Sequence, residues 1–441
     1  MRVFVTTYGC QMNEHDSQKI LSLLEDEGHE ATQDPEEADC VILNTCSVRE
    51  KPEQKVYSAL GRLLPLKRRK PSLIVGVGGC VAQQVGERLL ERAAHLDFVF
   101  GTHQIGLVPE LVRMAAHGIR SCRVEMSQEV PSLHYCPRPP AGQVRAFVTI
   151  MQGCDNRCSY CIVPRLRGPE RSRPLDHIVE EVENLARHGV KEVMLLGQNV
   201  NSYGRTLPGS PSFSSLLEKL QTVEGIERIR FTTSHPRDLS RELMDAMATL
   251  DKVCEHLHLP VQSGSTRVLG LMNRGYTAEQ YLEKVEALRE KVPGISITTD
   301  IIVGFPGETE RDFELTLELL QRVRFDSIYS FKFSPRPFTR AADMEETVPQ
   351  EVKAQRLKRV QELQEDITSS ILESCVGTCE EILVEGASPH GKGQVIGRTR
   401  TYRIVHLSGD PEALKGRLVR VRIDKSLRHS LWGIPTEAQA P

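Results

Sequence analysis

The chain has 441 residues, of which 39% are hydrophobic and 26% charged, with a formal net charge of −3. Two or three domains are expected, because a single core rarely grows beyond roughly 250–300 residues. The charge excludes a wholly basic protein, so any RNA contact must use local basic patches. No apolar run approaches the roughly 20 residues that span a bilayer, and we therefore expect no membrane partner.

The amino terminus enters a strand pattern directly and lacks the basic-then-apolar plan of a signal peptide. We therefore expect a cytoplasmic protein. Its twelve cysteines should be reduced in that compartment, so a disulfide framework is not expected. Clustered cysteines are better interpreted as metal ligands, and scattered ones as small buried residues.

Residues 1–118 alternate short apolar runs with amphipathic helical patterns. The apolar runs are RVFVTTYGC, DCVILNTC, LIVGVGGC and DFVFG. Strands that alternate with helices predict an α/β fold with a doubly wound parallel sheet. Residues 119–143 are rich in proline and are expected to form a linker.

A second series of strands and helices occupies residues 144–374. Its six strand candidates are RAFVTIMQG, EVMLLGQN, RIRFTTS, CEHLHLPVQSG, ISITTDIIVGFPG and SIYSFKFS. This pattern predicts a full or partial (βα) barrel, followed by one long charged helix over residues 349–373. Residues 375–438 contain short β-rich runs with glycine turns, which predict a small all-β, OB-like domain.

Three cysteines follow the first barrel strand with the spacing C-x3-C-x2-C: Cys154, Cys158 and Cys161. A structural zinc site normally has four protein ligands, and no fourth cysteine or histidine lies nearby in the sequence. An iron–sulfur cluster held by three thiolates leaves one iron open, where a substrate can bind. We favour the cluster, and a zinc loop or chance clustering is the alternative.

Three further cysteines, Cys10, Cys46 and Cys80, lie far apart in the sequence, yet each one ends a predicted parallel strand. In doubly wound sheets, ligands bind outside the carboxyl ends of the strands. Three thiols at equivalent strand ends can converge on one site, so we expect a second cluster with an open iron. The alternative is that each is a small buried residue.

The loop cysteines resemble those of the radical S-adenosylmethionine (SAM) superfamily. Together with GCQMNEHDS (9–17), NTCSVREK (44–51) and GQNVNSYG (197–204), they make nearly the whole chain resemble the radical SAM methylthiotransferase family. That resemblance implies an amino-terminal methylthiotransferase domain, a radical SAM core and a carboxy-terminal TRAM domain. It also implies two 4Fe–4S clusters, with SAM on the open iron of the loop cluster.

The resemblance implies an enzyme that adds a methylthio group to carbon 2 of N(6)-dimethylallyladenosine at position 37 of tRNA. Two SAM molecules would be used, and the second cluster would carry the sulfur. The alternatives are the same chemistry on a ribosomal protein or on threonylcarbamoyl-adenosine tRNA. A protein of another class, which binds RNA or carries electrons and has merely structural or redox clusters, is also considered.

Several residues are expected to contact SAM because they match the family's segments. Tyr160 lies where the family places a residue near the adenine, and GFPGE matches its glycine-rich segment after the fifth strand. The family's usual Gly-Gly-Glu is replaced here by Gly-Gln-Asn. The candidate SAM contacts are Tyr160, Gly197, Gln198, Asn199, Gly304 and Glu308.

RNA binding is expected at two places. Residues 392–428 hold ten Lys or Arg against three Asp or Glu, which suits phosphate contacts, although a solvated β-surface is the alternative. A basic loop also follows the cysteines. The candidate RNA contacts are Arg165, Arg167, Arg171, Arg173, Arg398, Arg400, Tyr402 and Arg403.

The expected partners are the tRNA anticodon stem-loop, an electron donor such as flavodoxin or ferredoxin, and sulfur or iron–sulfur assembly proteins. A monomer is expected. His256 and His258 alternate on one predicted strand and therefore share a face. That face is expected to be the barrel interior, where they either line a pocket or belong to the core.

Overall fold

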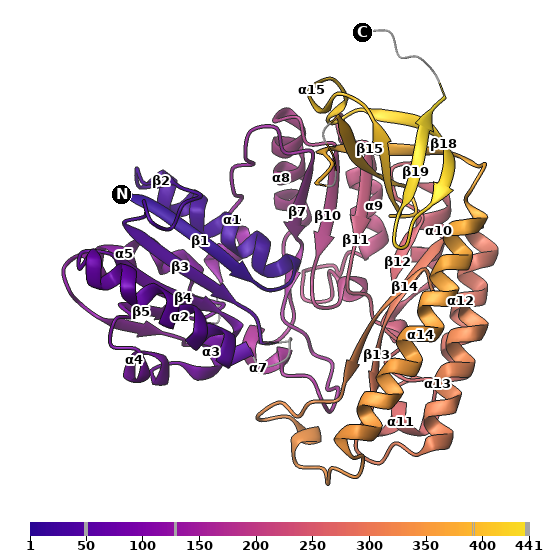
Figure 1. Cartoon of the computed structure of the whole chain (residues 1–441), viewed down its shortest axis with the longest axis horizontal. Helices are drawn as coiled ribbons and strands as arrows, with labels where there is room; N and C mark the ends of the chain where they lie inside the picture. The colour runs from indigo at the N-terminus through magenta and orange to yellow at the C-terminus, as the bar shows by residue number, and fades with distance from the viewer. Residues whose placement is uncertain (48–51, 128–129, 390, 392, 437–441) are drawn as a thin grey trace.

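The computed structural model describes residues 1–47, 52–127, 130–389, 391 and 393–436. Positions 48–51 of the NTCSVREK segment, Lys392 of the basic stretch and residues 437–438 lie outside the described residues. Three bodies follow one another along the chain (Figure 1). The amino-terminal sheet lies on the left beside the barrel strands, and the small carboxy-terminal barrel lies at the upper right.

The amino-terminal domain is built on a six-stranded sheet in the order β2-β1-β3-β4-β5-β6, with every pair parallel. Its strands are β1 (Arg2–Tyr8), β2 (Glu30–Ala31), β3 (Cys40–Thr45), β4 (Ile74–Gly79), β5 (Phe98–Phe100) and β6 (Ser121–Arg123). Its helices are α1 (Gln11–Asp26), α2 (Pro52–Arg69), α3 (Cys80–Val85), α4 (Arg88–Arg92), η1 (Ile105–Leu107) and α5 (Val108–Ala116).

Alternate residues of the central strands enter two separate cores. Val41 and Leu43 of β3 pack with residues of α2, α3 and α4, whereas Cys40 and Ile42 pack with residues of α1 and α5. Helices therefore cover both faces, which explains why β3 and β4 are buried throughout and apolar almost without interruption. The doubly wound fold is confirmed. The sheet continues beyond residue 118, however, because β6 pairs with β5 inside the expected linker.

The second domain contains six parallel strands in chain order, β7 to β14. Two three-stranded sheets, β11-β10-β7 and β12-β13-β14, are joined by a bridge between Ile229 and Val253. The strands are β7 (Arg145–Thr149), β10 (Glu192–Leu196), β11 (Arg228–Phe231), β12 (His256–His258), β13 (Ser296–Val303) and β14 (Ser327–Lys332). Among the described residues β14 pairs only with β13, so the partial barrel is confirmed.

Helices surround this barrel on its outer side (Figure 1). They are α8 (Leu175–Arg187), α9 (Phe213–Gln221), α10 (Arg241–Thr249), α11 (Thr266–Leu271), α12 (Ala278–Lys291), α13 (Glu310–Val323) and α14 (Gln350–Ser374). Shorter elements in the connections are α6 (Pro131–His134), β8 (Met151–Gln152), α7 (Val163–Arg167), β9 (Arg171–Ser172), η2 (Val200–Ser202), η3 (Pro236–Asp238) and η4 (Arg340–Ala342). None of the described helices is both long enough and apolar enough to cross a bilayer.

The carboxy-terminal domain is a closed five-stranded barrel in the order β15-β16-β17-β19-β18. Its elements are β15 (Cys379–Ala387), β16 (Gln394–Thr399), β17 (Ile404–Ser408), α15 (Pro411–Leu414), β18 (Leu418–Ser426) and β19 (Leu431–Pro435). Two fully buried arginines of β11, Arg228 and Arg230, donate hydrogen bonds to carbonyl oxygens of this barrel. The expected all-β domain is therefore confirmed and is firmly docked on the partial barrel.

Candidate functional site: two sets of three cysteines

The first set of cysteines lies at one edge of the amino-terminal sheet, and we call it the edge site (Cys10, Cys46 and Cys80). Tyr8 pairs with Thr45, and Thr45 pairs with Gly79, so three neighbouring strands end at the same level. Each cysteine follows one of these strand ends by one or two positions. Cys46 and Cys80 are buried, and Cys10 is half-buried.

Two asparagines and a glycine shape the edge site. Asn13 donates to the side-chain oxygen of Asn44 at 3.1 Å and to the carbonyl oxygen of Thr45 at 3.2 Å, and Asn44 donates back to the Asn13 carbonyl at 2.8 Å. Gly79 has a φ of 89°, and a Cβ there would lie 2.4 Å from the Thr45 carbonyl oxygen. These contacts hold the loops after β1, β3 and β4 together. Sequence reasoning missed the asparagines, whose only signal was that they lie within three residues of Cys10 and Cys46.

Electrostatics at the edge site favour an ionised thiol. The pKa of Cys10 is lowered to about 6 because the Cys46 side chain hydrogen-bonds to it, and the guanidinium of Arg167 adds to this effect against the cost of burial. Burial raises the pKa of Cys80, while Arg167 opposes that rise. The charges of Cys10 and Cys80 in turn act to raise the pKa of Arg167, which belongs to the barrel domain.

The second set lies on the connection between β8 and α7, and we call it the loop site (Cys154, Cys158 and Cys161). The amide of Cys154 donates to the Gly168 carbonyl at 3.2 Å, and that of Cys161 donates to the Cys158 carbonyl at 3.1 Å. Burial, together with neighbouring thiols, raises the pKa of Cys154 to about 11 and that of Cys161 to about 12. The buried guanidinium of Arg274 donates to the Cys158 sulfur at 3.4 Å, which offsets negative charge at this site.

The residues expected to contact SAM surround the loop site to different degrees. The Tyr160 hydroxyl is 3.5 Å from Arg274, and its ring packs edge-on against Phe305. The side-chain oxygen of Gln198 accepts from the Gly153 amide at 2.6 Å, which ties the 197–199 segment to the cysteine loop. These two residues therefore adjoin the cysteines directly.

Asn199 and Glu308 are turned into the protein. Asn199 is buried and donates to Asp238 at 2.7 Å. Glu308 accepts from the Gly304 amide and, at 3.0 Å, from Arg356, while burial raises its pKa to about 7. Both side chains support the loops around the site in this structure. Gly197 packs closely against Met151, and a Cβ at this position would collide with the Met151 side chain.

The donor chemistry at both sites suits iron–sulfur clusters. Among the described residues, no three His, Cys, Asp or Glu side chains converge closely enough for a single metal ion. A cubane binds its thiolates at separate corners, so its ligands stand farther apart than those of one ion. Each site supplies three thiols and one buried arginine, and Nη1 of Arg167 has no hydrogen-bond partner among the described residues. A negatively charged cluster therefore fits at each site.

Two of the four arginines in the basic loop are buried in ion pairs, which argues against a contact with RNA. Arg167 is 4% exposed and pairs with Asp16 at 2.8 Å, and Arg173 is fully buried and pairs with Glu181 at 2.5 Å. Both guanidinium groups are neutralised inside the protein and cannot reach a phosphate. Arg165 is exposed and lies over the Phe338 ring, and Arg171 is half-buried, so their contact with RNA stays a prediction.

The four candidates in the carboxy-terminal barrel also face the protein. Arg398 pairs with Glu385, Arg400 with Glu255 and Arg403 with Asp326, at 2.6–2.8 Å. Tyr402 packs among Arg230, Arg398 and His256. Arg400 and Arg403 therefore dock this barrel on the barrel domain, and the prediction that they contact RNA stays a prediction. The ion-pair partners of Arg400 and Arg403, Glu255 and Asp326, lie far away in the sequence and hold both arginines against the barrel domain.

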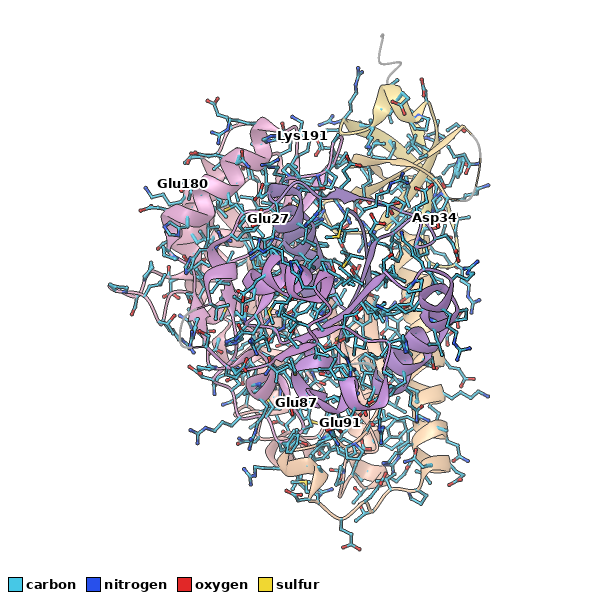
Figure 2. All side chains as sticks on the ribbon, turned by 90° about the vertical axis from the view of Figure 1, so that its left-hand side faces the viewer. Glu27, Asp34, Glu87, Glu91, Glu180 and Lys191 are labelled. Carbon is cyan, nitrogen blue, oxygen red and sulfur yellow. The ribbon has the colours of Figure 1, made fainter. Side chains whose placement is uncertain are left out.

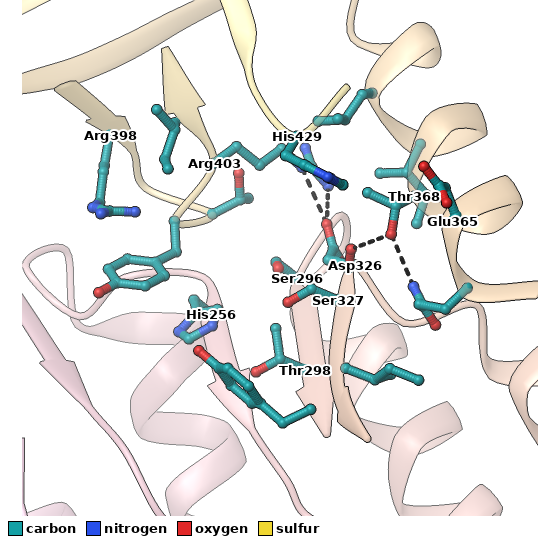
Figure 3. A pocket seen from close by; sticks show the side chains of 18 of the residues that line it. His256, Ser296, Thr298, Asp326, Ser327, Glu365, Thr368, Arg398, Arg403 and His429 are labelled. Atoms are coloured by element: carbon teal, nitrogen blue, oxygen red, sulfur yellow. Dashed lines mark hydrogen bonds and ion pairs between the residues drawn. The ribbon is translucent and has the colours of Figure 1, made fainter. Parts of the chain in front are cut away.

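A cavity of about 600 Å³ lies where the barrel domain, α14 and the carboxy-terminal barrel meet (Figure 3). Figure 3 shows His256, Thr298 and Ser327 lining it from the strands, with Arg398 and Arg403 across from them. Tyr329, 60% exposed, also lines it. His256 is thus a pocket residue, and burial holds its pKa well below the usual range, so the ring is neutral.

Comparisons with known proteins agree with this geometry. The chain matches the models of the Radical SAM superfamily over residues 148–320, the Uncharacterized protein family UPF0004 over residues 2–101 and the TRAM domain over residues 373–436. In fold it is similar to the radical S-adenosylmethionine methyltransferase TsrM from Kitasatospora setae, with a TM-score of 0.58, 16% identity, and coverage of 90% of this chain and 80% of that one.

Sequence relatives cover almost the whole chain. The tRNA-2-methylthio-N(6)-dimethylallyladenosine synthase of Geobacter metallireducens is 52% identical over 98% of this chain and 97% of its own length. The synthase of the same name from Aquifex aeolicus is 46% identical over 98% of both chains. The two sets of thiols, the partial barrel and these relatives lead to one conclusion: the chain belongs to the radical SAM methylthiotransferase family of tRNA-2-methylthio-N(6)-dimethylallyladenosine synthases.

Proposed function

We propose that this chain transfers a methylthio group to carbon 2 of N(6)-dimethylallyladenosine at position 37 of tRNA, using SAM and two 4Fe–4S clusters. The observation that carries the proposal is the joining of the two cysteine sites. Helix α7 begins two residues after Cys161 and ends at Arg167, beside the thiols of Cys10 and Cys80. The relatives named for this reaction cover the same span of chain.

The loop site is assigned to the cluster that binds SAM, and the edge site to the cluster that carries sulfur. Bound clusters supply the electron that cleaves SAM and the sulfur that is transferred, neither of which a side chain can provide. The chain's own residues position these groups. Arg274 stabilises thiolate charge at Cys158, and the half-buried ring of Tyr160 helps to exclude water from the loop site.

The 600 Å³ cavity is assigned to the modified nucleoside. Its volume lies in the usual range for small-molecule sites. Tyr402 lines this cavity and also packs against the apolar cluster of Met12, Met194 and Leu196, which Cys10 touches as well. A continuous set of contacts thus runs from the cavity to the edge site. Exposed Tyr329 offers a ring on which a base can stack.

The anticodon stem-loop is assigned to the outer face of β18. Arg420 and Arg422 alternate with buried valine and isoleucine, so they share the exposed face, and Lys425 lies over Trp432. The face of the amino-terminal domain that is turned away from the barrel domain is less suited to phosphate. Four exposed carboxylates lie on it, those of Glu27, Asp34, Glu87 and Glu91 (Figure 2). A cytoplasmic monomer, reduced by flavodoxin or ferredoxin and loaded by iron–sulfur assembly proteins, completes the proposal.

Charge removal tests the RNA surface. Replacing Arg417, Arg420 and Arg422 together by Gln should weaken tRNA binding, since all three are exposed. The plot of log Kd against log salt should flatten by about 0.7–0.9 for each phosphate that is no longer neutralised. The matched control is Arg400→Gln, which removes the ion pair with Glu255 and should lower the melting temperature while leaving the salt slope intact. An unchanged slope in the triple variant would contradict the assignment.

A single-turnover assay tests the chemistry. Dimethylallyl-modified tRNA is incubated with SAM, strong reductant and the variant in which Cys10, Cys46 and Cys80 are all Ala. We expect 5′-deoxyadenosine to form without any methylthio nucleoside, because the loop site is held by a separate segment. Formation of the methylthio nucleoside by this variant would refute the sulfur-carrying role. A ribosomal protein and threonylcarbamoyl-adenosine tRNA serve as alternative substrates for the unmodified enzyme, and turnover of either alone would redirect the proposal.

A further inference from the structure

Helix α7 belongs to the barrel domain by sequence but is bound by the amino-terminal domain. The hydroxyl of Thr102 donates to the carbonyl oxygen of Leu166 at 2.5 Å, and Nε2 of His103 is 3.0 Å from the carbonyl oxygen of Arg167. Cys80 packs with Ile162 and Leu166 in one small buried cluster. The segment that leaves the loop site is therefore seated on the edge site.

The guanidinium of Arg167 is buried in this contact between α7 and the amino-terminal domain. Its Nη2 donates to Oδ2 of Asp16 at 2.8 Å, and both side chains are almost fully buried, at 4% and 7% exposure. Its Nη1 has no hydrogen-bond partner among the described residues. The thiols of Cys10 and Cys80 are the other groups whose charge stabilises this guanidinium. One donor is thus left beside two cluster ligands.

A buried cation with an unused donor is costly unless an anion completes its surroundings. One carboxylate satisfies Nη2, Nη1 has no acceptor at hydrogen-bond geometry among the described residues, and the Cys80 thiol is the other side chain that interacts with this guanidinium. A cluster held by three thiolates provides sulfur acceptors and negative charge at the edge site. Arg167 is therefore arranged for a site that is complete only when the cluster is bound.

We infer that Arg167 is a positioning residue for the edge-site cluster: through Nη1 it donates to the cluster's sulfur ligands, and in this way it sets the cluster's reduction potential and couples cluster binding to the seating of α7. This inference rests on the proposed function, because it assumes that the edge site holds a cluster. A nearby cation stabilises the reduced, more negative cluster and so raises its potential. Since coupling is reciprocal, binding of the edge cluster also steadies the segment that follows Cys161.

The test uses the full chain with Cys154, Cys158 and Cys161 replaced by Ala, so that the edge cluster is the one observed. Redox titration followed by electron paramagnetic resonance compares three forms: this parent, Asp16→Asn, and Asp16→Asn with Arg167→Met. The double variant removes both buried charges together and so avoids leaving Asp16 unpaired. Asp16→Asn keeps the cation and should raise the potential above that of the parent.

Between Asp16→Asn and the double variant, we expect at least a tenfold fall in the ratio of reduced to oxidised cluster at fixed potential, which is 59 mV for one electron. Arg167→Lys should fall between them, because lysine keeps the charge but loses the planar fork. Arg165→Met, an exposed arginine of the same helix, is the matched control and should leave the potential unchanged. Equal potentials in Asp16→Asn and the double variant would overturn the inference.

Hydrogen exchange gives a second measurement that needs neither SAM nor tRNA. In the parent, binding of the edge cluster should slow exchange of the amides of residues 162–168, and in the double variant it should not. Equal protection in both would also overturn the inference. The readouts separate the two proposals, because a shifted potential in an enzyme that modifies no tRNA would refute only the proposed function.

Discussion

Each of the two cysteine sites supplies three cysteine ligands, but the chain brings the three together in a different way at each site. The loop site draws them from one short segment, and its geometry depends on turns within residues 153–168. The edge site draws them from three strand ends, and its geometry depends on the pairing of β1, β3 and β4. Their thiols differ accordingly. Burial raises the pKa of Cys161 to about 12, whereas the hydrogen bond from Cys46 and the charge of Arg167 lower that of Cys10 to about 6.

This contrast shows that a sheet edge can replace a local motif. Parallel pairing brings together residues that are distant in sequence, and the helices on both faces keep the edge fixed. The edge site also needs the other domain, because its cation comes from α7. The loop site has its own buried arginine, Arg274, within the barrel domain. Breaking the domain contact should therefore harm the edge site first.

The largest effect should come from removing each set of ligands. Replacing Cys154, Cys158 and Cys161 by Ala should abolish 5′-deoxyadenosine formation, because SAM then has no cluster to bind. Each triple variant should keep about half of the iron, since three thiolates are the minimum set for one cubane. Iron analysis with Mössbauer spectroscopy measures this. Iron content unchanged by loss of Cys10, Cys46 and Cys80 would show that the edge site holds no cluster.

An intermediate effect should come from two glycines, one at each site. Gly79→Ala places a Cβ 2.4 Å from the Thr45 carbonyl oxygen, and Gly153→Ala places one 1.9 Å from the Pro169 carbonyl oxygen, both at a positive φ. Each change forces backbone to move, at a cost of about 1–2 kcal/mol or more. Gly79→Ala should lower the occupancy of the edge cluster alone, and Gly153→Ala that of the loop cluster alone. Gly61→Ala, in open space on α2, is the control.

The smallest effect should appear in the acid dependence of the domain contact. His15 of α1 is fully buried, hydrogen-bonds to Thr149 of β7 at 2.6 Å and lies 3.7 Å from Glu181, with Lys19 and Arg173 also facing it. Burial and those two cations hold its pKa well below the usual value. The unfolded chain therefore binds the proton more readily, so this stability is complete above pH 6.5 and is lost as the pH falls below it.

Between pH 6.5 and 5.5 the loss from this one residue should be about 1 kcal/mol. The melting temperature of the wild type should fall over that interval, and His15→Gln should flatten the fall. His117→Gln, an exposed histidine of the same domain, is the control and should not flatten it. An equal pH slope in wild type and His15→Gln would show that His15 does not limit the docking of the two domains.

Much of this architecture was predictable because three of the cysteines lie at the carboxyl ends of predicted parallel strands. The strand-terminal positions of Cys10, Cys46 and Cys80 predicted a shared edge, since parallel strands align their carboxyl ends. The six barrel strands followed from alternation of apolar runs with helical patterns. The end of the first sheet was missed because β6 is only three residues long and was grouped with the proline-rich stretch that begins at Pro131.

The arginines were not predictable from the sequence. A charged residue in a loop or on a short strand is ordinarily solvated, and what buries Arg167 and Arg173 is a carboxylate from another element. The same holds for Arg400 and Arg403, whose partners Glu255 and Asp326 are far away in the chain. Local charge content therefore does not distinguish arginines that join two domains from arginines that face solvent.

Beside the ion pairs of Arg400 and Arg403, the docking of the carboxy-terminal barrel uses acceptors that every residue type possesses. Arg228 donates to the carbonyl oxygens of Arg398 and Glu381, and Arg230 donates to those of Thr399 and Arg400, at 2.6–3.0 Å. A backbone carbonyl is the same whatever side chain it carries. Side chains on the proposed RNA face of β18 can thus change over evolutionary time, and with them the choice of tRNA, without loss of these hydrogen bonds from Arg228 and Arg230.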